Sequence, residues 1–192
     1  MNMKKLLSEI RNCRVCEKHL EFGVNPIIAA SPQSRIVVIG QAPGRIVHET
    51  NIPWNDKSGD NLRNWMGIDK ALFYNAEFIA LMPMGFCYPG KNKAGDLPPR
   101  PECAPLWHHL LLASMSQVKL ILLIGQYAQN YYLSEKTKTT LTETVRNYKT
   151  YLPKFFPLPH PSPRNNIWQA KNDWFGKKVL PDLKKHVQHI LE

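Results

Sequence analysis

The sequence contains no apolar run of the roughly 18–20 residues that a helix needs to cross a bilayer. Its first residues, MNMKKLLSEIRNC, are charged but have neither a long apolar stretch nor a small-residue cleavage site, which argues against a signal peptide. Internal repeats, low-complexity tracts and a linker between two halves are also missing, so the 192 residues are expected to form one domain. These absences predict a cytoplasmic protein with no membrane partner.

Acidic residues are few compared with basic ones. The chain has 15 Asp and Glu against 25 Lys and Arg, which gives a formal net charge of +10. A surplus of this size favours a polyanionic partner, most simply nucleic acid. Hydrophobic residues make up 43% of the chain and charged residues 21%, which is enough apolar surface for a buried core and argues against disorder.

Cysteine is limited to four residues: Cys13, Cys16, Cys87 and Cys103. Structural disulfides are rare in a reducing compartment, so metal ligation is the better interpretation. The first two form a C-x2-C pair, and the other two enclose 15 residues of a loop rich in proline and glycine. Such a set favours a [4Fe–4S] cluster. Zinc prefers two C-x2-C pairs and stays the alternative, beside four unrelated buried thiols.

Short apolar runs alternate with helical patterns along the chain. The runs that predict buried strands are Arg35–Gly40, Phe78–Met82, Lys119–Gly125 and Phe155–Leu158. The helical patterns are Met3–Arg11, Ser58–Met66, Ala104–Met115, Gln126–Leu133, Leu141–Tyr148 and Trp174–Leu191. This alternation predicts an α/β sandwich around a mostly parallel sheet, with ligands beyond the carboxyl ends of the strands.

The loop after the first predicted strand reads Gly40-Gln41-Ala42-Pro43-Gly44. Its glycines and proline predict a tight turn that a ligand can approach closely, although such turns are common. Downstream, Trp54 and Asp56 stand just ahead of a predicted helix that Ser58 could cap. Trp54 could equally be a core residue.

The loop after the last predicted strand reads His160-Pro161-Ser162-Pro163-Arg164-Asn165-Asn166. Two prolines lower the entropy lost when a functional group is held in place. Ser162 and Arg164 are suitable phosphate partners, which favours a functional role for His160 over a chance surface histidine.

These three features, GQAPG, HPSPRN and the cysteine set, resemble in order and spacing the iron–sulfur classes of the uracil-DNA glycosylase superfamily. The resemblance implies a three-layer αβα sandwich with a small, mostly parallel central sheet, in a single domain spanning residues 1–192. A metal cluster would tie the N-terminal helix to the cysteine loop. The implied activity is that of a monofunctional DNA repair glycosylase, which flips uracil or a related deaminated base out of DNA and hydrolyses its N-glycosidic bond.

The resemblance also assigns roles to residues. His160 is expected to donate a hydrogen bond to the oxygen of the departing base. The other expected positions are base-binding Gly40, Gln41, Ala42, Pro43, Gly44 and Trp54; DNA-binding Ser162, Pro163, Arg164 and Asn165; and cluster ligands Cys13, Cys16, Cys87 and Cys103. Basic residues expected near phosphates are Lys91, Lys93, Arg100, Lys171, Lys177 and Lys178.

Two departures from the family patterns affect these expectations. GQAPG lacks the acid or Asn of GQDPY, GEAPG and GINPG. Residues 53–59, PWNDKSG, resemble the PFTGDxSG segment of the class that has GLAPA, with one residue fewer, so Asp56 is expected to orient water or stabilise the sugar cation; the alternative is that it only supports the helix start. The stretch 81–86, LMPMGF, has no Asn to read the base edge, so hypoxanthine or another damaged base is a possible substrate.

Two other functions stay open from the sequence. A catalytically silent relative would use the same pocket to bind damaged DNA or a nucleobase. A zinc-stabilised nucleic-acid-binding module would perform no base chemistry. For the glycosylase, the expected partner is DNA that contains uracil or another deaminated base, and the protein is expected to be a monomer.

Overall fold

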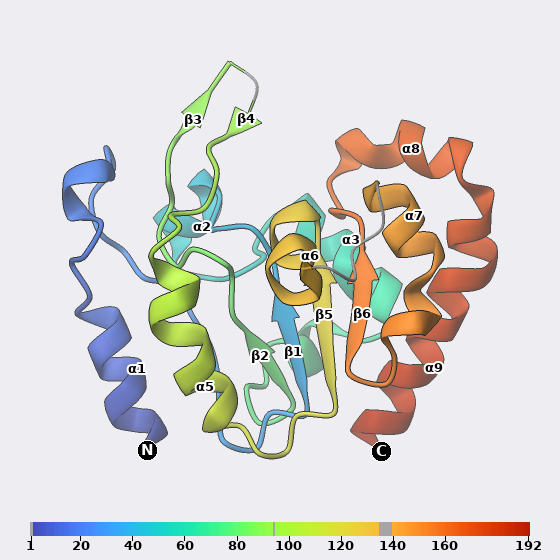
Figure 1. Ribbon diagram of the computed structural model, residues 1–192, viewed down its shortest axis with the longest axis horizontal. Coiled ribbons are helices and arrows are strands. Elements are labelled where there is room, and N and C mark those ends of the chain that lie inside the picture. Colours follow the sequence, from blue (N-terminus) through green and yellow to red (C-terminus); the bar gives the residue numbers. More distant parts are fainter. Residues whose placement is uncertain (1, 94, 135–139) are drawn as a thin grey trace.

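The computed structural model describes residues 2–93, 95–134 and 140–192. Its centre is a four-stranded sheet in the order β2-β1-β5-β6, in which every neighbouring pair is parallel (Figure 1). The strands are β1 (Ile36–Ile39), β2 (Ile79–Leu81), β5 (Leu120–Ile124) and β6 (Phe155–Leu158). Each lies inside a run that the sequence predicts as a strand, so the predicted parallel sheet is confirmed.

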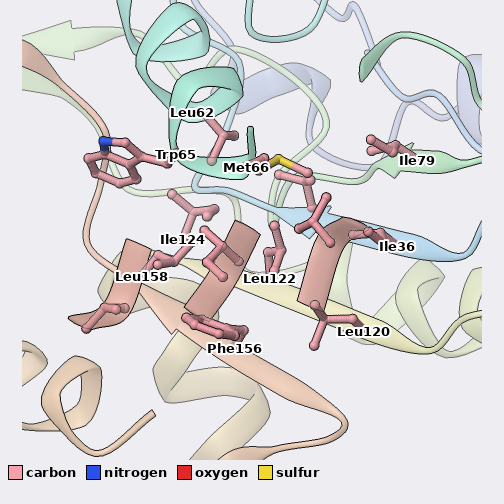
Figure 2. Packing of buried hydrophobic residues seen from close by; sticks show 14 of the residues in the cluster. Ile36, Leu62, Trp65, Met66, Ile79, Leu120, Leu122, Ile124, Phe156 and Leu158 are labelled. Atoms are coloured by element: carbon pink, nitrogen blue, oxygen red, sulfur yellow. The ribbon is translucent and has the colours of Figure 1, made fainter. Parts of the chain in front are cut away.

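The strands are buried on both faces, which explains why they read as continuous apolar runs rather than alternating ones. On one face, Ile36 and Val38 of β1 pack with Leu62 and Met66 of α3 (Lys57–Met66). Figure 2 shows this core, in which α3 lies over side chains from all four strands. α9 (Leu180–Leu191) covers the same face through Leu183, Val187 and Ile190.

The opposite face of the sheet is covered by three other helices. Val37 and Ile39 of β1 pack in a second core with residues of α1 (Met3–Arg11), α5 (His109–Ala113) and α6 (Gln126–Leu133). Successive residues of a strand point to opposite faces, so β1 contributes alternately to the two cores. Helices on both faces of one sheet make the three-layer αβα sandwich that the resemblance implies.

Shorter elements complete the described chain. The α-helices are α2 (Arg45–Thr50), α4 (Lys70–Phe73), α7 (Leu141–Arg146) and α8 (Asn166–Lys171). The 3-10 turns are Glu17–His19, Tyr148–Tyr151 and Pro163–Asn165. An antiparallel hairpin of β3 (Lys91–Asn92) and β4 (Gly95–Asp96) stands above the sheet in Figure 1. None of the described helices is long and apolar enough to cross a membrane.

Two predicted helices are interrupted by wide turns. Residues Ala104–His108 and Phe175–Val179 form π-helical turns that lead into α5 and α9. Pro181 is the second residue of α9, just after the second π turn, and a proline lacks the N–H that would continue the α-helical hydrogen bonding. Pro105 is the second residue of the first π turn, at its start. The apolar periodicity is therefore correct, but it does not reveal the local change in winding.

Candidate active site

All four strands of the sheet end at the same edge, and a cleft of about 460 Å³ opens there. Its walls come from the loops after β1, β2 and β6, the segment that leads into α3, and the β3–β4 hairpin. Among the lining residues are Gly40, Gln41, Ala42, Pro43, Gly44, Trp54, Asp56, His160, Ser162 and Arg164. The cleft thus brings together both sequence motifs, far apart along the chain, as expected for a parallel α/β sheet.

Trp54 forms one wall and faces His160 across a ring-centroid distance of 5.9 Å. A Cβ at Gly40 would lie 2.7 Å from Cζ2 of Trp54, so only glycine lets the indole approach the first motif this closely. Trp54 is partly buried and also packs against the core beside α3. The two interpretations of this residue, pocket aromatic and core residue, therefore describe different sides of one side chain.

The backbone of Trp54 has a φ of 55°, which L-residues other than Asn and Asp rarely adopt. Its carbonyl accepts hydrogen bonds from Nη1 of Arg63 at 3.4 Å and from the hydroxyl of Tyr74 at 3.3 Å. Arg63 is itself buried, pairs with Asp60, and lies over the ring of Phe73. These contacts, which the sequence gives no signal for, hold the indole in place.

His160 is placed by the loop that follows β6. The backbone N–H of Ser162 donates to Nδ1 of His160 at 3.2 Å, so in the neutral ring the proton is on Nε2. Burial lowers the pKa of His160, while the nearby charges of Asp56 and Asp96 oppose that shift. His160 is therefore a neutral hydrogen-bond donor in the cleft at neutral pH.

Asp56 lines the cleft and also begins α3. Its Oδ1 accepts from the backbone N–H of Gly59 at 2.9 Å, which makes Asp56 the N-cap. The prediction that Ser58 caps this helix is wrong. The apolar pattern predicts a start at Ser58, but α3 begins at Lys57, so Ser58 lies inside the first turn. Helix support and a place in the cleft coexist in Asp56.

Gln41 projects from the first motif toward the hairpin. Its Nε2 donates to the carbonyl of Leu97 at 2.9 Å, which fastens the end of the hairpin to the motif. Gly40 and Gln41 also hold the loop after β2, because their carbonyls accept from the N–H groups of Met84 and Gly85. From that loop Pro83 lines the cleft, and the wall there has no side-chain amide, as the sequence predicts.

The hairpin adds to the cleft an acid that sequence reasoning missed, beside two lysines that it expected near phosphates. Asp96 lines it, and a Cβ at Gly44 would lie 3.6 Å from Oδ2 of Asp96. Lys91 and Lys93 line the same side. The glycine-containing run that joins the two cysteines, PGKNKAGD, was a signal for a hairpin, but it has no alternating apolar pattern to suggest strands.

The predicted DNA-binding residues of the last motif divide between two hollows. Ser162 and Arg164 line the main cleft, whereas Asn165 lines a smaller one of about 310 Å³ beside α6. Ser162 Oγ accepts from the N–H of Arg164 at 3.3 Å and begins the 3-10 turn that contains Pro163. His160 and Gln41 line both hollows, so the two hollows are neighbours.

The four cysteines gather around one small cavity at the end of α1, apart from the cleft. Cys16, Cys87 and Cys103 are buried and Cys13 is half-buried. Burial raises the pKa of Cys87 to about 11 and that of Cys103 to about 12, so without a cation both are neutral thiols. Within the described ranges, no three Cys, His, Asp or Glu side chains form a group compact enough for one metal ion.

Not every predicted basic contact faces the cleft. Arg100 forms an ion pair with Glu102, whose carboxylate accepts from Sγ of Cys16 at 3.7 Å. It therefore belongs to the surroundings of the cysteine cavity. Lys177 pairs with Asp173 at 2.7 Å on the surface.

Comparisons with known proteins agree with this geometry. A family model described as the uracil DNA glycosylase superfamily matches residues 28–184, which include both motifs but not Cys13 and Cys16. A relative from Thermotoga maritima, named type-4 uracil-DNA glycosylase, is 24% identical over 191 residues. That match covers 95% of this chain and 92% of the relative.

Proposed function

Because this chain belongs to the uracil DNA glycosylase superfamily, we propose that it hydrolyses the N-glycosidic bond of uracil, or of a related deaminated base, in DNA. One observation carries the proposal: the ring of Trp54 and the ring of His160, whose neutral form carries its proton on Nε2, lie next to each other in a single cleft at the carboxyl edge of the sheet. An aromatic surface and a neutral donor are the two groups that a flipped base and its developing negative charge require.

In the proposed reaction the flipped base stacks on Trp54, and Gly40 to Gly44 surround it. As the bond from C1′ to the base breaks, the base oxygen gains negative charge and accepts a hydrogen bond from Nε2 of His160. A neutral imidazole suffices for this role. The carboxylate of Asp56 stabilises the positive charge on the sugar or orients the attacking water.

The cysteine cavity fits a [4Fe–4S] cluster, and we propose this cofactor. Four thiols line one cavity. The sequence has a single C-x2-C pair and a widely spaced second pair, which favours iron–sulfur over zinc, since zinc prefers two C-x2-C pairs. Bound there by Cys13, Cys16, Cys87 and Cys103, the cluster would supply a structural cross-link.

DNA would be held by the last motif and the basic hairpin. Ser162, Arg164, Lys91 and Lys93 line the main cleft, and Asn165 lines the smaller hollow beside it. Pro163 belongs to the 3-10 turn between them. Contacts of these residues with phosphates would make the affinity fall as salt rises. A cytoplasmic location, a single domain and a monomeric state stay predictions.

A glycosylase assay tests the proposal. Labelled oligonucleotides carrying uracil, hypoxanthine or xanthine, single-stranded and paired, are incubated with protein and then cleaved with alkali. Strand breaks at one lesion support the enzyme and identify its base. Borohydride should trap no protein–DNA adduct if the enzyme is monofunctional, even though two lysines line the cleft. No breaks from a folded, metal-loaded protein would favour the alternative, a silent relative that binds damaged DNA.

A further inference from the structure

We propose that Asp96, brought to the cleft by the β3–β4 hairpin, is a second catalytic carboxylate, which accepts the proton of the attacking water. This inference rests on the proposed glycosylase function. It addresses a gap in the first motif, since GQAPG has no acid of its own, and Asp56 has one oxygen committed to the start of α3.

The position of Asp96 is fixed by contacts at the base of the hairpin. Asp96 pairs with Lys91 across the two strands, and the N–H of Leu97 donates to the carbonyl of Gly90 at 2.9 Å. Nε2 of Gln41 then fastens the carbonyl of Leu97 to the first motif at 2.9 Å. Gln41 is therefore a positioning residue for the hairpin as well as part of the cleft.

Both motifs approach the hairpin on the cleft side. A Cβ at Gly44 would lie 3.6 Å from Oδ2 of Asp96, so the carboxylate rests against the end of GQAPG. A Cβ at Gly95 would lie 3.6 Å from Nη1 of Arg164, so the hairpin also meets the HPSPRN loop. Asp96 thus lies where the two catalytic loops and the hairpin converge.

The carboxylate of Asp96 is chemically available there. It makes no ion pair within 4.0 Å and accepts no side-chain hydrogen bond from any residue that the structure describes. Asp56, by contrast, uses Oδ1 to accept from the N–H of Gly59. A general base needs a free lone pair, and Asp96 has one on each oxygen.

The charges of the transition state determine whether a carboxylate is useful beside the base or beside the sugar. Beside the base, a carboxylate would repel the negative charge that develops on the leaving group. Beside the sugar, it attracts the positive charge on C1′ and can accept a proton from water. A carboxylate beside the sugar therefore lowers the activation free energy, whereas one beside the base raises it.

In the proposed step, water replaces the base at C1′. The bond between C1′ and the base nitrogen breaks, and its electron pair leaves with the base, whose oxygen accepts a hydrogen bond from His160. The oxygen of water forms a bond to C1′, and one of its protons passes to a carboxylate oxygen of Asp96. That proton then leaves to solvent, and the released base takes a proton from solvent.

Substitution of Asp96 by Asn tests this step, with Glu77→Gln as a matched loss of one exposed acid far from the cleft. We expect single-turnover rates of Asp96→Asn to fall by roughly 100-fold or more. Binding to an oligonucleotide with an uncleavable 2′-fluoro analogue of the lesion should stay within a few-fold of the original protein. The rise of rate with pH on the acidic side, measured in the original protein, should be absent.

Chemical rescue separates a catalytic from a structural role. Formate added to Asp96→Ala should restore part of the rate, because it supplies the missing carboxylate. Full activity of Asp96→Asn would overturn this inference alone. So would a decrease in rate that formate does not reverse and that is matched by an equal decrease in DNA affinity. If the original protein releases no base at all, the proposed function fails and this step fails with it.

Discussion

Trp54 is enclosed so tightly that single atoms decide its position. A Cβ on Gly40 would meet Cζ2 of the indole at 2.7 Å, and one on Gly59 would meet the Trp54 carbonyl oxygen at 1.8 Å. The second contact is with backbone, which has no free rotation to relieve it. The first contact is with the indole ring. Hydrogen bonds from Arg63 and Tyr74 to the Trp54 carbonyl fix the backbone that carries this ring. The sequence contains both glycines, but it does not show that they make room for Trp54.

We predict that Gly40→Ala lowers base release by at least roughly tenfold, because the displaced indole no longer matches a bound base. Single-turnover rates on the preferred lesion provide the measurement. Gly176→Ala is the control, since a Cβ there has nothing within 4 Å. Equal rates for the two variants would show that Trp54 is not the stacking surface.

The two roles of Asp56 can be separated by substitution. Asn is as good an N-cap as Asp, so Asp56→Asn keeps the hydrogen bond to Gly59 and removes only the charge. We predict unchanged thermal stability, unchanged DNA binding and a loss of turnover for this variant. Asp56→Ala should in addition lose about 1 kcal/mol of stability. Full activity of Asp56→Asn would leave Asp56 with its helix-capping role only.

How well the sequence predicts a helix or strand depends on how that element is stabilised. α1 matches its prediction at both ends because its apolar residues Met3, Leu6 and Ile10 recur at helical spacing and are all buried. The four strands are found within a residue of prediction because burial on both faces makes them continuously apolar. The sequence alone is therefore sufficient for the sheet and for the loops at its carboxyl edge.

The hairpin is an element that the sequence does not reveal. β3 and β4 have two residues each, and most of their side chains are exposed, so they carry no apolar pattern. Their pairing depends on contacts with distant residues, such as that of Gln41 with Leu97. Asp96 was missed for this reason, although the loops on either side of the cleft were expected.

The cysteine cavity joins parts of the chain that are far apart in sequence, the end of α1 and the segments on either side of the hairpin. We predict that the purified protein is brown, with broad absorbance near about 400 nm, and that Cys13→Ser removes most of this absorbance and of the bound iron. Cys13 is half-buried, so its substitution disturbs packing less than that of the three buried cysteines. Without the cross-link, the segment before Cys16 should be cleaved faster in limited proteolysis.

The control for that variant is its circular dichroism spectrum, because the core of the sheet does not include the cysteines. Colourless protein that contains zinc would replace the iron–sulfur assignment by the zinc alternative. If the protein contains neither metal, and Cys13→Ser is cleaved at the same rate as the original protein, the four cysteines are unrelated buried thiols.

Over the whole molecule, the response to acid follows from a buried histidine. His108 is 1% exposed, with Nε2 placed 3.1 Å from the carbonyl of Pro83 and Nδ1 placed 2.7 Å from the hydroxyl of Tyr132. Neutral histidine satisfies both contacts by donating to Pro83 and accepting from Tyr132. It joins the layer of α6 to the loop after β2, whose Pro83 lines the cleft.

Burial lowers the pKa of His108 to about 4, against 6.5 in the unfolded chain. The unfolded state therefore binds this proton first as the pH falls, so the free energy of unfolding decreases between pH 6.5 and pH 4. The full contribution of His108 to that decrease is about 3 kcal/mol. Urea unfolding at pH 7, 5.5 and 4.5 measures the slope. His108→Gln should show a smaller loss over this range than the original protein, whereas the exposed control His19→Gln should show the same loss. A parallel decrease in all three proteins would mean that other groups, such as His160, dominate the acid response.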